Sequence, residues 1–287
     1  MSLGVCLAGG GVKGAAHIGV LKALEEKNIK IDYIGGASSG SIVASLYAAG
    51  FSSDEIYDIF KKYCRKIKYV DFKNIIKLIL GLIFTGRIVI DGLNSGNAIE
   101  KLIYKECKSK NIFNIDDIKM PLIIPSVDML SGKVLCFTSI KNRQFFSDKI
   151  MFDGDIEIGK AVRASCSYPG IFSPCMYKAT KLIDGGIREN VPWKELKLLG
   201  ADQIINVIFE EQIDVECCDN IINVIGRSIS LLCRELSNYE MEGSDITVKI
   251  NCKKIGLLDM NKIDELYEIG YDTMRSIIDN DNIIVNN

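Results

Sequence analysis

Twice near its N-terminus, the sequence passes from a short apolar run through a glycine-rich segment into a helix pattern. Residues 3–8 are apolar, residues 9–14 contain four glycines, and residues 14–26 place apolar side chains at helical spacing. The order then repeats, because residues 31–35 favour a strand and residues 39–49 a helix. Strands that alternate with helices predict a mostly parallel sheet, since parallel strands need crossover connections that are usually helical.

The same alternation continues along the rest of the chain. Further strands are expected over residues 122–127, 133–138, 181–183, 203–209 and 246–250, and further helices from Ser52 onward and over residues 91–108, 156–164, 221–242 and 261–278. We therefore expect an α/β fold, a three-layer α/β/α sandwich around a central, mostly parallel sheet. No repeat or linker-like tract divides the sequence, so residues 1–287 are predicted to form a single domain. Its motif-bearing core covers about 3–210, and a C-terminal helix–strand–helix covers 220–280.

Composition excludes several classes of function. Lys and Arg number 35 and Asp and Glu 37, a net charge of -2, so no strong positive field favours nucleic acid. The single histidine, His17, leaves no multi-histidine metal site, and none of the ten cysteines forms a C-x-x-C pair. We expect free thiols in a reducing cytoplasm and no bound metal. Residues 1–11 lack a signal-peptide pattern, and no apolar run suits a membrane span, so a cytoplasmic protein is expected.

The first glycine-rich segment matches the G-x-G-x-x-G pattern through Gly9, Gly11 and Gly14. Such a loop before a helix can hold a pyrophosphate, or it can hold the oxyanion of an acyl-transfer reaction. A dinucleotide site would place an acidic residue after the second strand, whereas Asp32 stands before the end of that strand. A tight strand-to-helix turn without a ligand is the third reading of the pattern.

The second glycine-rich segment, GASSG, is a G-x-S-x-G sequence between a strand and a helix. In this setting the pattern is typical of a nucleophile elbow, which lifts the central serine, Ser38, away from the sheet. Small residues at Gly36 and Gly40 avoid clashes in the sharp turn. A serine that only caps the helix is the alternative, and Ser39 fits that role nearly as well as Ser38 does.

A serine nucleophile needs a general base, and the sequence offers two candidates. His17 lies within the apolar helix pattern after the first glycine loop, where a packed structural role is the commoner one. Asp184 ends a short strand and precedes Gly185 and Gly186. Because strand ends at one edge of a parallel sheet converge, Asp184 can meet Ser38, although Asp-Gly-Gly is also a common turn.

Four landmarks together resemble the patatin-like phospholipases. They are GGGVKGAAHIGVL, GASSG, AVRASCSYPGIFSP and LIDGGIRENVP, and the resemblance runs from about residue 3 to residue 209. It implies the three-layer α/β/α fold and the hydrolysis of acyl esters of lipids by a Ser-Asp dyad. Two positions depart from the usual family pattern, since Lys13 stands where Arg is commoner and Ala37 where Thr is commoner.

The resemblance also implies a role for each matching residue. Ser38 is expected to be the nucleophile and Asp184 the base. The oxyanion is expected to be held by backbone amides of the first loop, at Gly10, Gly11, Val12 and Lys13. Supporting glycines are expected at Gly9, Gly14, Gly36, Gly40, Gly185 and Gly186.

These expectations predict a serine lipid acyl hydrolase, acting through an acyl-enzyme on a phospholipid or another acyl-ester lipid, with no metal or organic cofactor. Two alternatives stay open. One is a thioesterase or small-ester esterase that uses the same dyad. The other is a non-enzymatic nucleotide- or phosphate-binding module that uses the GGGVKG loop.

The segment 74–84 is the most apolar stretch whose role the sequence leaves undecided. Only Lys77 interrupts it, and Arg87 follows shortly after. A buried core helix and a helix that lies on a membrane surface both fit this pattern. Peripheral membrane contact through 74–84 is therefore one of two expectations for this segment.

Overall fold

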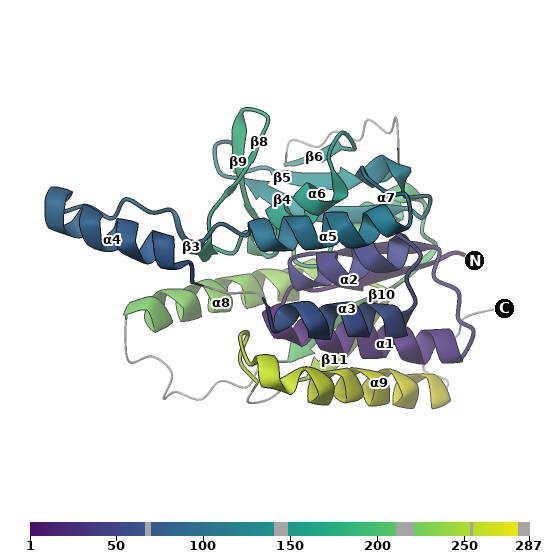
Figure 1. Cartoon of the computed structure of the whole chain (residues 1–287). Coiled ribbons are helices and arrows are strands. Elements are labelled where there is room, and N and C mark those ends of the chain that lie inside the picture. The colour runs from purple at the N-terminus through teal and green to yellow at the C-terminus, as the bar shows by residue number, and fades with distance from the viewer. Residues whose placement is uncertain (67–69, 141–148, 211–220, 253–254, 281–287) are drawn as a thin grey trace.

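The structure is a computed structural model, and it describes residues 1–66, 70–140, 149–210, 221–252 and 255–280. Within this part of the chain, a nine-stranded sheet forms the centre (Figure 1). Its main path runs β11 (Ile246–Asn251), β10 (Gln203–Glu210), β1 (Leu3–Leu7), β2 (Tyr33–Gly36), β4 (Leu122–Asp128), β5 (Val134–Thr138) and β6 (Ile150–Asp153). The pairs from β11 to β4 are parallel, while β4 and β5 are antiparallel. The mostly parallel sheet expected from the sequence is thus confirmed.

Four short strands lie near the end of the sheet where β9 meets β4. β8 (Cys175–Tyr177) and β9 (Thr180–Asp184) form a hairpin, and β9 pairs antiparallel with β4, with Asp184 as the register partner of Ser126. A separate two-stranded sheet joins β3 (Gly92–Asn94) to β7 (Gly170–Phe172). These strands bring the end of β9 close to the loop that follows β2.

Helices cover both faces of the sheet, as the sandwich prediction requires. One face packs into the larger apolar core through α1 (Gly14–Glu26), α2 (Ser39–Ala48), α3 (Ser53–Cys64), α5 (Asn97–Ser109), α6 (Ile158–Ser165) and α9 (Ile263–Asp279). The other face forms a smaller core against α7 (Trp193–Leu199), and α8 (Ile221–Glu240) lies beside it. The α3 helix begins with the expected cap, since Ser52 and Glu55 form a complete capping box.

Some elements differ from their expected bounds. The helix expected over 91–108 begins only at Asn97, because 92–94 forms β3 and Gly96 takes a left-handed conformation with φ +72°. The pattern did not predict β6, β7, β8 or α7, which are all short. The eight described cysteines are free thiols, and Cys217 and Cys218 lie outside the described residues. In the described part of the chain, no helix has both the length and the apolar character that a membrane crossing needs.

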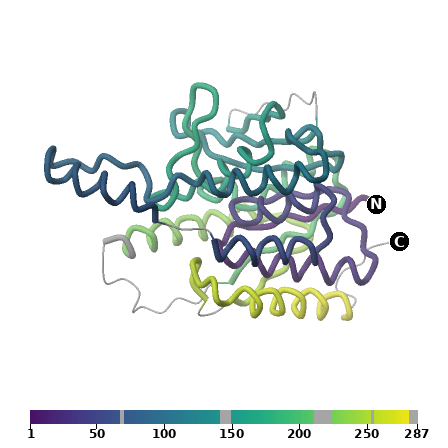
Figure 2. The backbone as a smooth tube through the Cα atoms, viewed as in Figure 1, coloured from purple at the N-terminus to yellow at the C-terminus, as the bar shows by residue number. Residues whose placement is uncertain are grey.

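One helix leaves the body of the molecule. The α4 helix (Phe72–Thr85) projects away from the sandwich, and the returning chain runs beside it (Figure 2). Val89 packs onto Gly81, which is the one residue of α4 that is buried. The side chains of Ile83 and Phe84 are 69% and 78% exposed. The alternative that 74–84 forms a buried core helix is therefore wrong.

Candidate active site

Ser38 stands at the sharp turn between β2 and α2. Its backbone has φ +50° and ψ -123°, a left-handed region that non-glycine residues rarely occupy. Such strain is typical of a nucleophile elbow, because the turn must hold the side chain above the sheet edge. Gly40 sits so close to the Leu7 carbonyl that any Cβ would overlap it, which explains the glycine of the G-x-S-x-G pattern. Gly36 in turn lies against the backbone of Gly40.

Asp184 occupies the end of β9 and is 2% exposed. Its Oδ1 accepts a 2.9 Å hydrogen bond from the Gly186 amide, while its own amide donates to the Ser167 carbonyl at 3.1 Å. Burial raises the pKa of the carboxyl to about 7, although hydrogen bonding from Ser38 and from the Gly186 amide acts in the opposite direction. A carboxyl with a pKa near neutrality can accept a proton, as a general base must.

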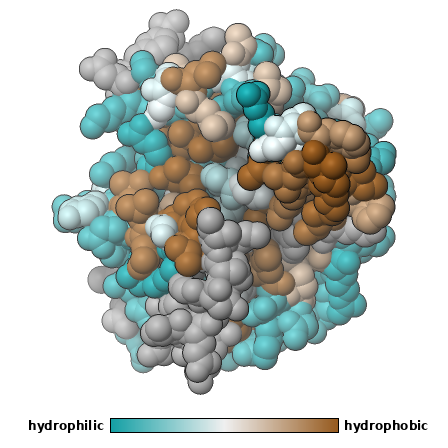
Figure 3. Space-filling view, turned by 90° about the vertical axis from the view of Figure 1, so that its left-hand side faces the viewer, coloured by the Kyte–Doolittle hydropathy of each residue, from teal (hydrophilic) through white to brown (hydrophobic). Residues whose placement is uncertain are grey.

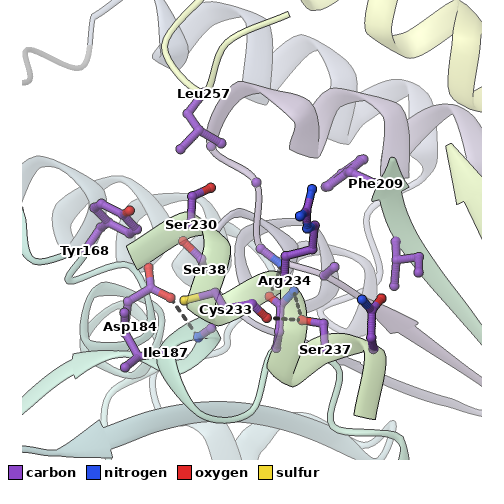
Figure 4. A pocket seen from close by; sticks show the side chains of 18 residues that line it. Ser38, Tyr168, Asp184, Ile187, Phe209, Ser230, Cys233, Arg234, Ser237 and Leu257 are labelled. Carbon is purple, nitrogen blue, oxygen red and sulfur yellow. Dashed lines mark hydrogen bonds between the residues drawn. The ribbon is translucent and has the colours of Figure 1, made fainter. Parts of the chain in front are cut away.

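The two side chains meet in one pocket. Ser38 and Asp184 both line it, and Figure 4 shows them side by side there. Asp184 Oδ2 is buried and has no hydrogen-bond partner of regular geometry among the described residues, so a proton accepted from Ser38 would give it one. The structure thus brings together the two residues that the landmarks single out.

Residues of the third landmark hold both members of this pair. The Ser38 amide donates a 3.0 Å hydrogen bond to Ser165 Oγ at the end of α6. Two residues later, Ser167 accepts from the Asp184 amide. Arg163, which is 6% exposed, donates to Ser167 Oγ and to the Ser173 carbonyl, each at 2.9 Å. The segment AVRASCS is therefore the support that joins the elbow to the aspartate.

The first glycine loop borders the same pocket, but most of its amides already have acceptors. Gly9 donates to Asn190 Oδ1 at 2.8 Å, Gly10 to Ser39 Oγ at 3.1 Å, Val12 to the Leu257 carbonyl at 2.9 Å and Lys13 to the Gly10 carbonyl at 3.1 Å. Among the described residues, the Gly11 amide alone of this loop's first five has no hydrogen-bond partner. Of the four expected oxyanion donors, Gly11 is thus the one that is open, while Gly10, Val12 and Lys13 are engaged.

The remaining supporting glycines sit at close approaches around the two catalytic candidates. Gly9 lies against Ser38 Cβ and Gly14 against Ser39 Cβ. Gly185 abuts the Pro125 carbonyl, so its small size lets β9 meet β4. A Cβ at Gly186 would press on the amide group of Asn190 and on Asp184 Oδ1.

His17 is fully buried behind the glycine loop and does not line the pocket. Its Nε2 lies 2.7 Å from the Ala8 carbonyl, so Nε2 carries the proton and donates it. Its ring stacks on Phe209 with centroids 4.6 Å apart. Burial lowers the pKa of the imidazole to about 4, which keeps it neutral. These contacts fit the structural role expected for His17.

Sequence reasoning missed Asn190, although it lies within the fourth landmark. Asn190 Oδ1 accepts from the Gly9 amide, and its Nδ2 donates to Ser237 Oγ at 3.1 Å. Its backbone amide donates to Glu240 Oε2 at 3.2 Å. Asn190 thereby ties the loop after Asp184 to the first glycine loop and to α8. Only its place in the landmark could have pointed to it.

A group of buried carboxyls lies behind the pocket. Burial raises the pKa of Glu189, Glu195 and Glu240, and that of Glu240 reaches about 7. Glu240 also anchors α8, because its carbonyl accepts from Trp193 Nε1 at 2.7 Å. Within the described residues, no three Asp, Glu, His or Cys side chains are grouped so that they could hold a metal ion.

Comparisons with known proteins support this assignment of the landmarks. The chain is 29% identical over 206 residues to Lysophospholipase NTE1 of Debaryomyces hansenii, and equally so to that of Coccidioides immitis. Each match covers 72% of this chain but only 12% and 11% of those proteins, so the chain spans a small part of their length.

The fold has a solved counterpart. The crystal structure of VipD from Legionella pneumophila superposes with a TM-score of 0.53 at 15% identity, over 97% of this chain and 67% of that one. At this identity the likeness concerns the fold alone.

The sequence of residues 5–197 matches the family described as Patatin-like phospholipase. This stretch exceeds half of the chain and contains all four landmarks. The resemblance is therefore confirmed, and the chain belongs to the patatin-like phospholipase family.

Proposed function

We propose that this protein is a serine hydrolase of lipid acyl esters, with Ser38 as nucleophile and Asp184 as general base. The observation that carries the proposal is the pair itself: a serine on a strained elbow and a buried carboxyl face one pocket. Family membership and relatives named as lysophospholipases support a lipid substrate.

In the first half-reaction, Ser38 Oγ attacks the ester carbonyl while Asp184 accepts the hydroxyl proton. The Gly11 amide donates to the oxygen on which negative charge develops. The Asp184 carboxyl then returns the proton to the departing alcohol as the carbon–oxygen bond breaks. An acyl group remains on Ser38.

In the second half-reaction, the Asp184 carboxylate takes a proton from a water molecule, which attacks the acyl carbonyl. Ser38 leaves with that proton, and a free fatty acid is released. His17 takes no part, since its pKa of about 4 and its buried position behind the loop keep it from the reacting atoms.

The nucleotide-binding alternative finds less support. A phosphate cradle needs several free backbone amides, yet Gly9, Gly10 and Val12 donate within the protein. Lys13 is 3% exposed and does not line the pocket. The thioesterase or small-ester alternative uses the same dyad, so substrate comparison must separate it from lipid hydrolysis.

The test measures fatty-acid release from single-chain phospholipid in detergent micelles. We expect Ser38→Ala and Asp184→Asn to lower turnover by about a thousandfold or more. Ser45→Ala is the matched control, because Ser45 is a buried serine on the same helix that bonds only to the Ile42 carbonyl. A folded Ser38→Ala protein that keeps full turnover would refute the dyad. Turnover of acyl thioesters without turnover of the phospholipid would favour the alternative.

We also propose that α4 contacts the lipid surface. Its exposed apolar side chains form a large cluster at one end of the molecule, which Figure 3 views directly. Lys73, Lys77 and Arg87 accompany this cluster, and basic residues beside an apolar helix face suit an anionic membrane. The pocket-lining helix α8 extends toward the same end (Figure 1).

Binding to anionic vesicles tests this contact. Replacing both Ile83 and Phe84 by Glu should weaken binding at least about tenfold with unchanged melting, because two exposed side chains lose burial in the lipid. Leu198→Glu on α7 is the matched control, since Leu198 is 48% exposed and α7 lies far from α4 (Figure 1). Unchanged vesicle binding in the double variant would refute the contact.

A further inference from the structure

Two pockets meet at Ser38. The first, described above, extends from Ser38 toward α8, and the second extends from Ser38 toward α3. Gly11, Ser38, Tyr168 and Leu257 line both pockets. Figure 4 shows Leu257 and Tyr168 around Ser38. A substrate whose ester lies on Ser38 can therefore extend in two directions, one into each arm.

The arm toward α3 has an apolar lining. Its side chains include Ile42, Phe60, Ile99 and Phe172, and no charged residue lines it. Phe60 and Cys64, both nearly buried, bound it on the α3 side. An arm of this kind favours an alkyl chain, because burying each CH₂ group contributes about 0.8 kcal/mol.

The arm toward α8 differs because it carries a positive charge. Arg234 lines it together with Asn190 and Ser237. Asp184 is the one acidic residue of that lining, and Figure 4 places it across the pocket from Arg234. Arg234 is an exposed residue that borders this arm, and among the described residues it forms no ion pair. A guanidinium in this position suits a phosphate group, which it can bind with two parallel hydrogen bonds.

We propose that the substrate lies across Ser38 with its single acyl chain in the arm toward α3 and the phosphate of its alcohol half against Arg234. This inference rests on the proposed hydrolase function and deepens it. The substrate class that fits is a single-chain phospholipid, because one arm is apolar and the other cationic. Arg234 then binds the phosphate of the substrate and thereby favours phospholipids over uncharged acyl esters.

Hydrolysis of two matched substrates tests Arg234. A monoacyl glycerophospholipid and a monoacylglycerol with the same chain are compared in the same mixed micelles. Arg234→Gln should lower kcat/KM for the phospholipid about tenfold, the effect of one charge-assisted hydrogen bond, and should lower it far less for the monoacylglycerol. For Arg234→Lys, kcat/KM for the phospholipid should lie between the values for the wild type and for Arg234→Gln. Arg227→Gln is the matched control on the same helix, because Arg227 is outside the pocket lining. Equal losses on both substrates, or an equal effect in the control, would overturn the proposal.

A binding measurement separates this inference from the hydrolase proposal. Ser38→Ala protein is titrated with a single-chain alkyl phosphocholine and with an alkylglycerol of the same length, neither of which has a carboxylic ester that could be hydrolysed at the site. The phosphocholine should bind more tightly, and adding Arg234→Gln should remove about a tenfold preference. This result does not depend on turnover. Equal affinity for the two ligands, unchanged by Arg234→Gln, would overturn the assignment even if the enzyme is active.

Chain-length preference tests the apolar arm. Cys64→Phe places a larger side chain at the α3 end of the arm, so it should lower kcat/KM for long acyl chains relative to short ones by about fivefold. Cys64→Ser keeps the size and is the control, and Cys64→Leu is the smaller step if the Phe variant melts early. A uniform change across chain lengths in a folded variant would place the acyl chain elsewhere.

Discussion

The Gly9 amide donates a 2.8 Å hydrogen bond to Oδ1 of Asn190, a residue 181 positions later in the chain. This bond joins the first glycine loop to the segment that follows Asp184. Asn190 also donates to Ser237 on α8. Its side chain therefore connects three segments that line the pocket, namely the first glycine loop, the segment after Asp184 and α8. The geometry of the proposed Ser38–Asp184 dyad should thus depend on Asn190, which lies outside it.

Replacing Asn190 should therefore impair catalysis by positioning. We expect Asn190→Ala to lower kcat more than it raises KM, and to cost about 1–3 kcal/mol of stability through the lost hydrogen bonds. Asn190→Asp should in addition move the rising limb of the pH profile upward, because a second carboxylate raises the pKa of Asp184. Kinetics across pH and thermal melting measure both effects. If the pH profile of a folded Asn190→Asp protein rises at the same pH as that of the wild type, residue 190 does not lie close enough to act on Asp184.

The pH dependence of activity should follow Asp184. The base works only when ionised, and its pKa is raised to about 7. The kcat/KM value should accordingly rise with pH through about 7 and then reach a plateau. His17, with a pKa lowered to about 4, should add no limb near neutrality. A profile that is already flat from about pH 5 upward would show that the base is not this buried carboxyl.

The same group makes stability depend on pH. Asp184 has a pKa of 3.8 in an ordinary setting and about 7 in the folded protein, so the folded state holds a proton that the unfolded state has released. The free energy of unfolding should therefore fall as pH rises from about 4 to about 7, and this contribution should level off above.

Asp184→Asn isolates that contribution, because Glu189, Glu195 and Glu240 titrate in both proteins and their effects cancel in the difference. The variant should gain stability relative to the wild type as pH rises through this window. Denaturant titrations at several pH values measure the difference. A difference that does not change with pH would contradict the raised pKa.

His17 should be dispensable for the chemistry. His17→Gln removes the stack on Phe209 and weakens the hydrogen bond to the Ala8 carbonyl, so a modest loss of stability is expected. Turnover should fall less than about tenfold, whereas losing a true base costs several orders of magnitude. A His17→Gln protein that melts normally but is as inactive as Ser38→Ala would replace the dyad by a histidine-dependent mechanism.

The local parts of the site could be predicted from the sequence. The elbow at Ser38 and the glycine loop are each set by a few consecutive residues. The place of Asp184 at a strand end makes it a candidate base, while its preference over His17 comes from the family resemblance. The alternation of strands and helices also predicted the order of the main elements, because each has its own apolar period.

Long-range features could not be predicted in the same way. The Leu257 carbonyl reaches the Val12 amide across most of the chain, and Ser39 Oγ reaches the Gly10 amide across 29 positions, so neither amide is open as expected. Arg234 reads as an ordinary surface residue until α8 is placed beside the pocket. The apolar pattern of 74–84 fits burial and exposure equally, and only the projection of α4 from the body decided it.

Covalent labelling can identify the nucleophile and its dependence on Asp184 in one experiment. A fluorophosphonate bearing an alkyl chain reacts with an activated serine, and the labelled peptide identifies that residue by mass spectrometry. We expect one label, on Ser38, with labelling at least about a hundredfold slower in Asp184→Asn and nearly unchanged in His17→Gln. A label on another serine, or equally fast labelling of Ser38 without Asp184, would contradict the Ser38–Asp184 dyad.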